Sequence, residues 1–241
     1  AFLDDYHPEV TQYSRKHALK RLQAAVRQAR MICDGVDFQP IAGPAVEVPA
    51  ADIEIDFDIE WDASGRIYQW GMRIRDGQDD ATARYQPVVS FEPVDDEGEI
   101  ALAERAAAVI AQLRADAESS GRTVAVYHWA HPEVSMTRKF GCVAAALDGL
   151  TLDLRAWFTG TFHVRGEASI KAVAQFLGFT WAVDDPGGRL SMAKIEIARG
   201  AGPEARAARQ WCLGYNESDV AAQAAIRDGI RVLHGQKQGE A

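Results

Sequence analysis

Apolar and acidic side chains alternate along the segment IEIDFDIEWD, residues 53–62. A period of two predicts a β-strand whose two faces differ in character. One face is expected to be dry and the other to carry a row of carboxylates. These acids are Glu54, Asp56, Asp58, Glu60 and Asp62.

The row of carboxylates leaves two interpretations open. On a solvent-facing strand, the acids are simply hydrated. On a covered, central strand, an unpaired carboxylate is costly, so it becomes neutral or meets a cation. Mg²⁺ and Mn²⁺ are the natural cations in such a place, because they prefer carboxylate oxygens and water.

The segments that follow extend the first strand into a sheet. Turn signals at Gly65 and Gly77 separate it from strand-like residues 66–75 and 82–92, which predicts an antiparallel meander. Two more strands are expected at 123–129 and 150–158.

Helices are expected where apolar residues recur three or four positions apart. The segment 98–121 is one, and its apolar positions are Ile100, Ala103, Ala107, Ile110 and Leu113. The other helices are expected at 15–30, 132–147, 169–179 and 203–235. The order of elements predicts an α/β fold, a mixed sheet of three antiparallel strands followed by alternating helices and strands, with helices on both faces.

Residues 36–51 contain three prolines and no clear period, so they predict a linker. The chain is therefore expected to divide into an N-terminal part, 1–51, with a basic amphipathic helix and this linker, and a main domain, 52–241. The absence of an initiator Met suggests a fragment of a longer protein.

The composition is that of a globular protein, with 47% hydrophobic and 25% charged residues. No apolar run approaches the roughly 20 residues of a membrane helix. The three cysteines lie far apart and form no CxxC pair, which predicts reduced thiols and a cytoplasmic location. The net charge of −9 argues against a nucleic-acid partner, although residues 14–30 hold six Lys and Arg and no acid.

Two further acidic positions are candidates for chemistry. Tyr215 and Asp219 stand at i and i+4, so one helix face presents both, although Ser218 or Asp219 equally suits a helix N-cap. Glu133 follows the expected strand at 123–129, where functional side chains are common, and it also suits the first turn of a helix. His128 and His131 lie near it in sequence as weaker metal-ligand candidates.

The combination is more specific than its parts. An Asp-x-Glu on the first strand, an acid after a later strand and a Tyr-x-x-x-Asp on a late helix resemble the DEDDy branch of the ribonuclease H-like 3′–5′ exonucleases. The closer resemblance is to the ribonuclease H-like domain of predicted RecB-family nucleases, and it covers about residues 52–235. The matching segments are FDIE (57–60), VYHWAHPE (126–133), TLDLRAWF (151–158), SIKAVAQFLGFTW (169–181) and YNESDVAAQ (215–223).

The resemblance implies roles for five residues. Asp58, Glu60 and Asp219 would be metal ligands, Glu133 would stand where the exonucleases usually have an Asp, and Tyr215 would orient the attacking water. It implies two Mg²⁺ or Mn²⁺ ions about 3.5–4 Å apart and hydrolysis of phosphodiester bonds at the 3′ end of single-stranded DNA or RNA. Asp56 shares the strand face and stays open as a ligand or a supporting acid.

Several residues in the matching segments suit contacts with the nucleic-acid backbone. They are Arg138, Lys139, Arg165 and Lys171. Trp129 and Phe162 are candidates for stacking on a base or for burial in the core. The basic helix at 15–30 is a candidate for binding nucleic acid or for packing.

Besides a purely structural α/β domain without nuclease activity, two alternatives to the exonuclease stay open. One is a catalytically weak ribonuclease H-like docking module of a larger RecB-like nuclease, because Glu replaces Asp at 133 and residues 185–200 match no known segment. The other is an endonuclease acting on RNA·DNA hybrids, although Tyr215 favours the exonuclease. The resemblance also predicts a RecB-like nuclease domain in the same parent chain.

Overall fold

The computed structural model describes residues 12–43, 45–130 and 132–238. The chain divides into two units. The first comprises residues 1–46 and 158–168, and the second comprises 47–157 and 169–241. The sequence pattern gave no sign that residues 158–168 belong with the N-terminal unit.

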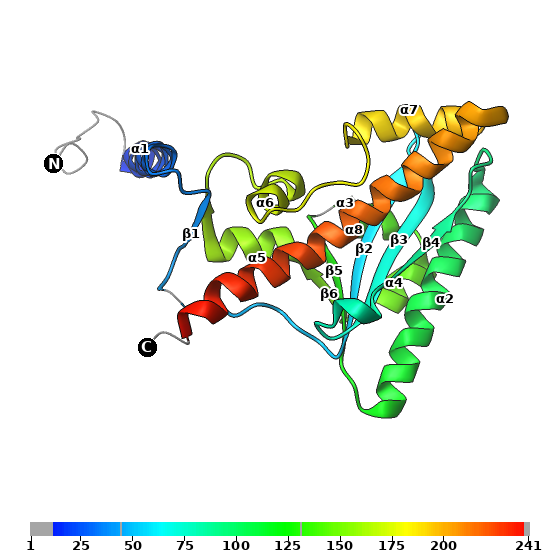
Figure 1. Ribbon diagram of the computed structural model, residues 1–241, viewed down its shortest axis with the longest axis horizontal. Helices are drawn as coiled ribbons and strands as arrows, with labels where there is room; N and C mark the ends of the chain where they lie inside the picture. The colour runs from blue at the N-terminus through cyan, green and yellow to red at the C-terminus, as the bar shows by residue number, and fades with distance from the viewer. Residues whose placement is uncertain (1–11, 44, 131, 239–241) are drawn as a thin grey trace. The chain divides into compact units, whose positions relative to one another are not determined.

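The second unit is built on a mixed five-stranded sheet with the order β4-β3-β2-β5-β6 (Figure 1). The central strand β2 runs antiparallel to β3 and parallel to β5, and β5 runs parallel to β6. The predicted meander and the α/β class are therefore confirmed. The strands are β2 (Ile53–Trp61), β3 (Ile67–Asp76), β4 (Arg84–Val89), β5 (Val124–His128) and β6 (Thr151–Asp153).

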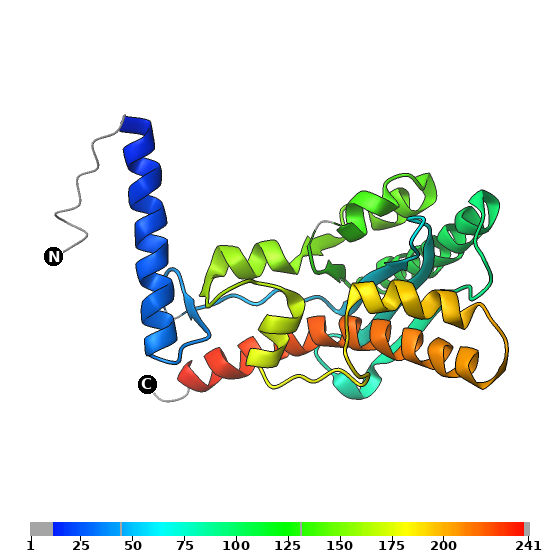
Figure 2. The same cartoon turned by 90° about the horizontal axis from the view of Figure 1, so that it is seen from above.

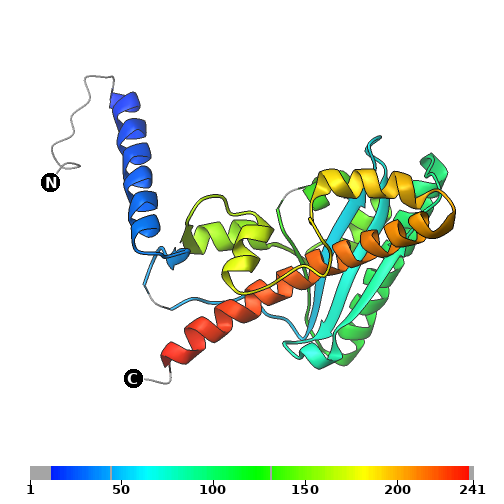
Figure 3. The same cartoon turned by 45° about the horizontal axis from the view of Figure 1, so that its top comes forward.

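Helices cover both faces of this sheet, as predicted. α2 (Asp96–Ser120) and α4 (Gly141–Leu147) pack against one face, and α8 (Gly202–Gln238) crosses the other (Figures 1 and 3). α7 (Gly188–Ala198) lies along the first half of α8 (Figure 2).

The face of the sheet toward α2 is the apolar, buried face that the alternation predicted. Ile55 and Phe57 of β2 are fully buried there, together with Ala103 and Ile110 of α2. α2 ends at Gly121, whose φ of 68° is the left-handed conformation that closes a helix. Ile100, expected on the buried face of this helix, is instead 48% exposed.

The acidic face of β2 is not solvent-facing, so the interpretation of hydrated acids is wrong. Glu54 and Asp56 are fully buried, and Glu60 is 7% exposed. The reason is α8, which covers this face and lies some 160 residues further along the chain. No pattern local to β2 could reveal that cover.

Two predicted elements differ from the observed secondary structure: one predicted helix is interrupted, and one predicted strand continues as a helix. The helix expected at 132–147 is two short helices, α3 (Pro132–Thr137) and α4, because Phe140 between them adopts an extended conformation. The strand expected at 150–158 ends at Asp153 and continues as α5 (Leu154–Thr161), whose first turn is capped by Asp153 through a 2.9 Å bond from the Ala156 amide.

The region 185–200, which no motif matched, forms α7. The helix expected at 169–179 is α6 (Ile170–Phe176), which begins at the capping side chain of Ser169 and is followed by Gly178 at φ 83°.

The short helix η1 (Asp80–Thr82) connects β3 to β4. Ser218 and Asp219 lie in the middle of α8, so neither caps a helix.

The first unit contains the predicted basic helix as α1 (Gln12–Cys33). The segment 36–51 is not only a linker, because β1 (Phe38–Pro40) pairs with β7 (Phe162–Val164) in an antiparallel ribbon. Phe162 is 2% exposed and packs edge-on against Phe38, so it belongs to this small core rather than to a base-stacking surface. Among the helices that the structure describes, none has the length and apolar character to cross a membrane.

Candidate metal centre

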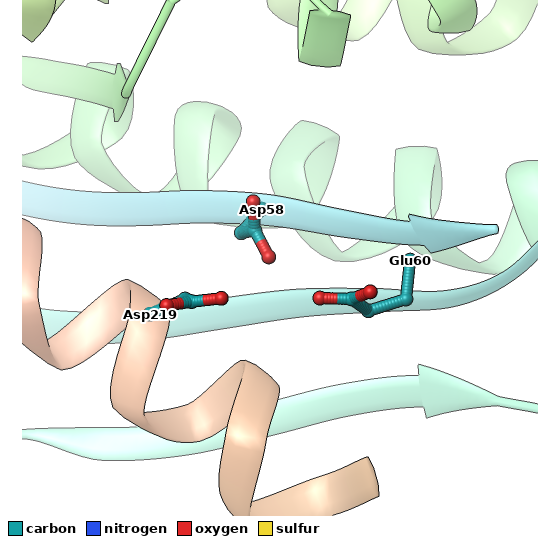
Figure 4. A group of neighbouring side chains, drawn as sticks. All are labelled: Asp58, Glu60 and Asp219. Carbon is teal, nitrogen blue, oxygen red and sulfur yellow. The ribbon is translucent and has the colours of Figure 1, made fainter. Parts of the chain in front are cut away.

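Three carboxylates from two elements converge on the covered face of the sheet. Asp58 and Glu60 extend from β2 and Asp219 from α8, and one oxygen of each lies within 4.8 Å of the others. In Figure 4 the three carboxyl groups face a common point. The sequence prediction that these three residues form one site is therefore consistent with their placement.

A glycine allows the helix to approach the strands so closely. Gly71 of β3 pairs with Asp58, and a Cβ at this glycine would lie 1.7 Å from Oδ1 of Asn216 on α8. Any other residue at position 71 would push α8 away from β2. Asp219, less than one turn beyond Asn216, would then no longer reach Asp58.

Each of the three carboxylates is held through one oxygen by a neutral donor. Asn216 Nδ2 donates to Asp58 Oδ2 at 2.8 Å. Ser191 Oγ donates to Glu60 Oε2 at 2.7 Å, and Trp181 Nε1 donates to Asp219 Oδ1 at 2.7 Å. These bonds fix the carboxylates and leave the second oxygen of each for a ligand.

The other acids of the same strand are neutralised by arginines. Arg227 of α8 donates to both Glu54 and Asp56, and Arg75 binds Glu54 at 2.7 Å. Asp62 accepts from the Ser64 and Arg66 amides in the turn after β2 and pairs with Arg199. Asp56 is therefore a structural ion-pair partner rather than a metal ligand.

Asp58, Glu60 and Asp219 have no such partner. Within the described part of the chain, no Lys or Arg nitrogen lies within 4.0 Å of their carboxyl oxygens. The acidic row is thus divided: two acids meet arginines, one closes a turn, and the two between them face Asp219. Desolvated like charges without a counter-ion are the arrangement that a divalent cation stabilises.

The pKa values of these acids reflect burial and mutual repulsion, which the nearby Lys171 offsets only in part at Glu60 and Asp219. Burial raises the pKa of Asp58 well above its usual range, and the neighbouring Glu60 and Asp219 raise it further. Burial and then Asp219 raise the pKa of Glu60 to about 8, and burial raises that of Asp219 to about 6. A divalent ion must displace these protons, so its affinity increases as the pH rises toward 8.

Glu133 lies at the start of α3 and lines the same small cavity, of about 130 Å³, with Asp58, Glu60, Tyr215 and Asp219. Burial raises its pKa to about 8. Its Oε2 is buried without a hydrogen-bond partner, and the nearest cationic candidate is His128 Nδ1 at 3.9 Å. Glu133 is not among the three residues whose oxygens lie within 4.8 Å of one another, but its orphaned buried oxygen makes it a candidate for a fourth ligand group. His131, the other histidine considered with it, lies outside the described residues.

Tyr215 stands one turn before Asp219 on α8 and lines the same cavity. Burial and the surrounding acids raise the pKa of Tyr215 above its ordinary value, so the phenol stays protonated and can orient a water molecule but not deprotonate it. Lys171 Nζ lies 3.2 Å from the phenol oxygen and 4.9 Å from the ring centroid. Of the residues predicted to contact substrate, Lys171 is the one that reaches this site.

No contact with the three carboxylates is described for the other predicted substrate-binding residues. Lys139 pairs with Glu99 of α2 at 2.8 Å, on the opposite side of the sheet from the three carboxylates. Arg138 is exposed, and Arg165 belongs to the first unit, where it pairs with Asp37. Trp129 is 7% exposed and is a core residue rather than a stacking platform.

The sequence analysis did not identify the donors Ser191, Asn216 and Trp181. Asn216 and Trp181 stand inside the matching segments, but nothing in their spacing indicates which way they point. Ser191 and the nearby cavity-lining Met192 belong to α7, the helix that no motif predicted.

No protein-family model matches the chain, and no curated protein or solved structure gives a significant match.

Ser191→Ala should weaken metal binding without unfolding the protein. Ser191 is fully buried between Glu60 and the Tyr68 hydroxyl, which lies 3.1 Å away. Loss of the Glu60 bond frees that carboxylate to turn, and the expected cost is about 10-fold or more in Mn²⁺ affinity, measured by calorimetry. Ser191→Thr should restore the affinity.

Tyr68→Phe is the matched control, because it removes the other partner of Ser191 and leaves the bond to Glu60. Equal loss of Mn²⁺ affinity in Ser191→Ala and Tyr68→Phe would mean that Ser191 acts through packing alone.

Proposed function

We propose that the protein is a metal-dependent 3′–5′ exonuclease that hydrolyses phosphodiester bonds of single-stranded nucleic acid. The observation that carries this proposal is the cluster of Asp58, Glu60 and Asp219, with Tyr215 lining the same cavity. Glu60 and Asp219 are buried and Asp58 is half-buried, and no described Lys or Arg nitrogen lies within 4.0 Å of their oxygens. The sheet, with three antiparallel strands extended by two parallel ones, agrees with the fold that the ribonuclease H-like resemblance implies.

The residues present fit two divalent ions. Asp58, Glu60 and Asp219 each offer one oxygen that no donor holds, and Glu133 offers an orphaned one. When bound, Mg²⁺ or Mn²⁺ would lower the pKa of a water molecule and neutralise charge on the attacking and leaving oxygens.

The chain itself supplies position and charge around these oxygens. Tyr215, whose phenol stays protonated, lines the cavity with Asp219 and would hold a water molecule in one orientation. Lys171 places a cation beside the phenol, where it can contact a phosphate oxygen of the substrate. Gly188 and Met192 of α7 close one wall of the cavity, whose volume of about 130 Å³ suits a terminal phosphate group better than a duplex passing through.

The proposal is tested with 5′-labelled single-stranded DNA and RNA oligonucleotides in Mg²⁺, Mn²⁺ or EDTA. A ladder that shortens from the 3′ end, requires metal and is slower in Tyr215→Phe supports the exonuclease. Glu217→Gln is the control, because Glu217 is exposed on the same helix turn. Internal cuts in an RNA·DNA hybrid would instead indicate an endonuclease. Metal binding without cleavage of any substrate would contradict the exonuclease and favour the alternative function, a docking module of a RecB-like nuclease.

A further inference from the structure

The first unit carries a cationic groove that lies outside the metal centre. The groove has a volume of about 630 Å³ and is formed by α1 and the β1–β7 ribbon. Arg27 and Arg30 line it, with Gln23, Gln39 and His163. Asp34 is the acid in the lining.

Four of the six Lys and Arg residues of α1 are arranged in one stripe. Lys16, Lys20, Arg27 and Arg30 follow one another at intervals of four, seven and three residues, with Gln23 between them. At 3.6 residues per turn these positions fall within an arc of about 80° and extend over about 21 Å of helix. Lys16 and Lys20 therefore continue the charge of the groove along the helix.

Among the residues that the structure describes, these four cations have no acidic partner. No described Asp or Glu oxygen lies within 4.0 Å of their nitrogens, whereas Arg165 in the same unit is paired with Asp37. Burial and the nearby Arg27 lower the pKa of His163, so the imidazole is neutral at pH 7 and can donate or accept a hydrogen bond. In a chain of net charge −9, an unpaired basic stripe of this length is a local exception.

The groove is held as a rigid feature. Gln28 joins α1 to the strand β7 through a bond to the Val164 carbonyl at 2.5 Å and one from the Gly166 amide at 2.9 Å. Met31, 2% exposed, is the buried apolar contact of α1, and the Val36 amide donates to its carbonyl at 2.9 Å. Arg27 and Arg30 are thus presented from a helix that is fixed at this end.

We propose that this groove and stripe bind the phosphate backbone of single-stranded nucleic acid without reading its sequence. The lining offers arginine and glutamine side chains, which are phosphate donors, and no array of aromatic rings for base stacking. The proposal extends the proposed exonuclease function, since it gives the acidic protein a separate surface that retains a polyanion.

Binding is measured by fluorescence anisotropy of a fluorescein-labelled 20-nucleotide oligo(dT), in EDTA, so that neither metal nor hydrolysis contributes. If Arg27 and Arg30 each neutralise one phosphate, Arg27→Gln/Arg30→Gln should reduce the slope of log K against log salt by about 1.4. At 0.1 M salt this corresponds to a loss of affinity on the order of 20-fold. Oligo(U) should show the same change in slope and the same loss of affinity, because the phosphate backbone is bound without reading the bases.

Arg105→Gln/Arg206→Gln is the matched control, because both arginines are exposed in the second unit and its charge change is the same. Equal effects in the two pairs of variants would overturn the proposal, since the loss would then reflect net charge. Unchanged oligonucleotide binding, with weaker sedimentation on phosphatidylserine vesicles in the groove variant alone, would overturn it in favour of a membrane surface.

The result also separates this proposal from the nuclease. If oligo(dT) binding depends on Arg27 and Arg30 but Mn²⁺ supports no cleavage, the groove proposal is supported and the exonuclease proposal is contradicted. If cleavage occurs and the groove variant leaves its KM unchanged, the exonuclease proposal is supported and the groove proposal is contradicted. Circular dichroism verifies that α1 stays folded in both pairs.

Discussion

Asp58→Asn is expected to lower the rate of hydrolysis by a factor on the order of 10³ and to raise the thermal stability of the protein in EDTA. The rate falls because the side chain central to the cluster loses its charge and one metal ligand, a loss of several kcal/mol in transition-state stabilisation. The stability rises because burial and neighbouring acids raise the pKa of Asp58, so the ionised group is costly in the folded protein without metal.

The two effects are measured by single-turnover cleavage of a labelled oligonucleotide and by calorimetric melting. Asparagine has the shape of aspartate and can still bond to Asn216 after a flip of either amide. Glu217→Gln, an equal loss of charge on the exposed side of α8, should change neither quantity. Retention of a third of the wild-type rate, or a lower melting temperature in EDTA, would contradict the role of Asp58.

Arg227→Met is expected to destabilise the second unit by about 3–5 kcal/mol. Arg227 is fully buried, binds Glu54 and Asp56, and stacks its guanidinium 3.8 Å from the ring centroid of Tyr127. Its removal leaves Asp56 with Arg73 at 3.7 Å as its nearest cation. The free energy of unfolding is measured by urea titration, followed by circular dichroism.

Arg231→Met provides the comparison, because this arginine is one turn further along α8 and its side chain is 16% exposed. Its loss should cost about 1 kcal/mol. Restoring neutrality with Asp56→Leu in the Arg227→Met background should recover much of the stability. An Arg227→Met variant as stable as the wild type would mean that the buried pairs do not join α8 to β2.

The fold could be predicted from the sequence where the pattern is local. The alternation in residues 53–62 gave the central strand, and the spacing of Ala103, Ala107 and Ile110 gave α2, because each pattern matches one regular structure. α7 was missed since it begins at the glycine pair Gly187–Gly188 and its buried residues, Ser191, Ile195 and Ala198, are mostly small or polar. The break at Phe140 was missed because it depends on packing against Trp70.

The candidate site could be predicted only as a set of residues. The order of acids and the Tyr-x-x-x-Asp motif indicated Asp58, Glu60 and Asp219, but all five acids of the strand look alike in sequence. Whether an acid is an ion-pair partner or a candidate metal ligand depends on whether it faces Arg227 or Asp219. These two residues are eight positions apart on α8. That choice is set by the register of the helix on the sheet, which Gly71 and Asn216 fix.

The most direct test of the account is a calorimetric titration of the metal-free protein with Mn²⁺. The central claim is that one part of the acidic face of β2 is neutralised by arginines and the other by divalent metal. We expect saturable binding that is tighter at pH 8 than at pH 6, is lost in Asp58→Asn and is unchanged in Glu217→Gln. A folded wild-type protein with no saturable binding up to millimolar Mn²⁺ would contradict it.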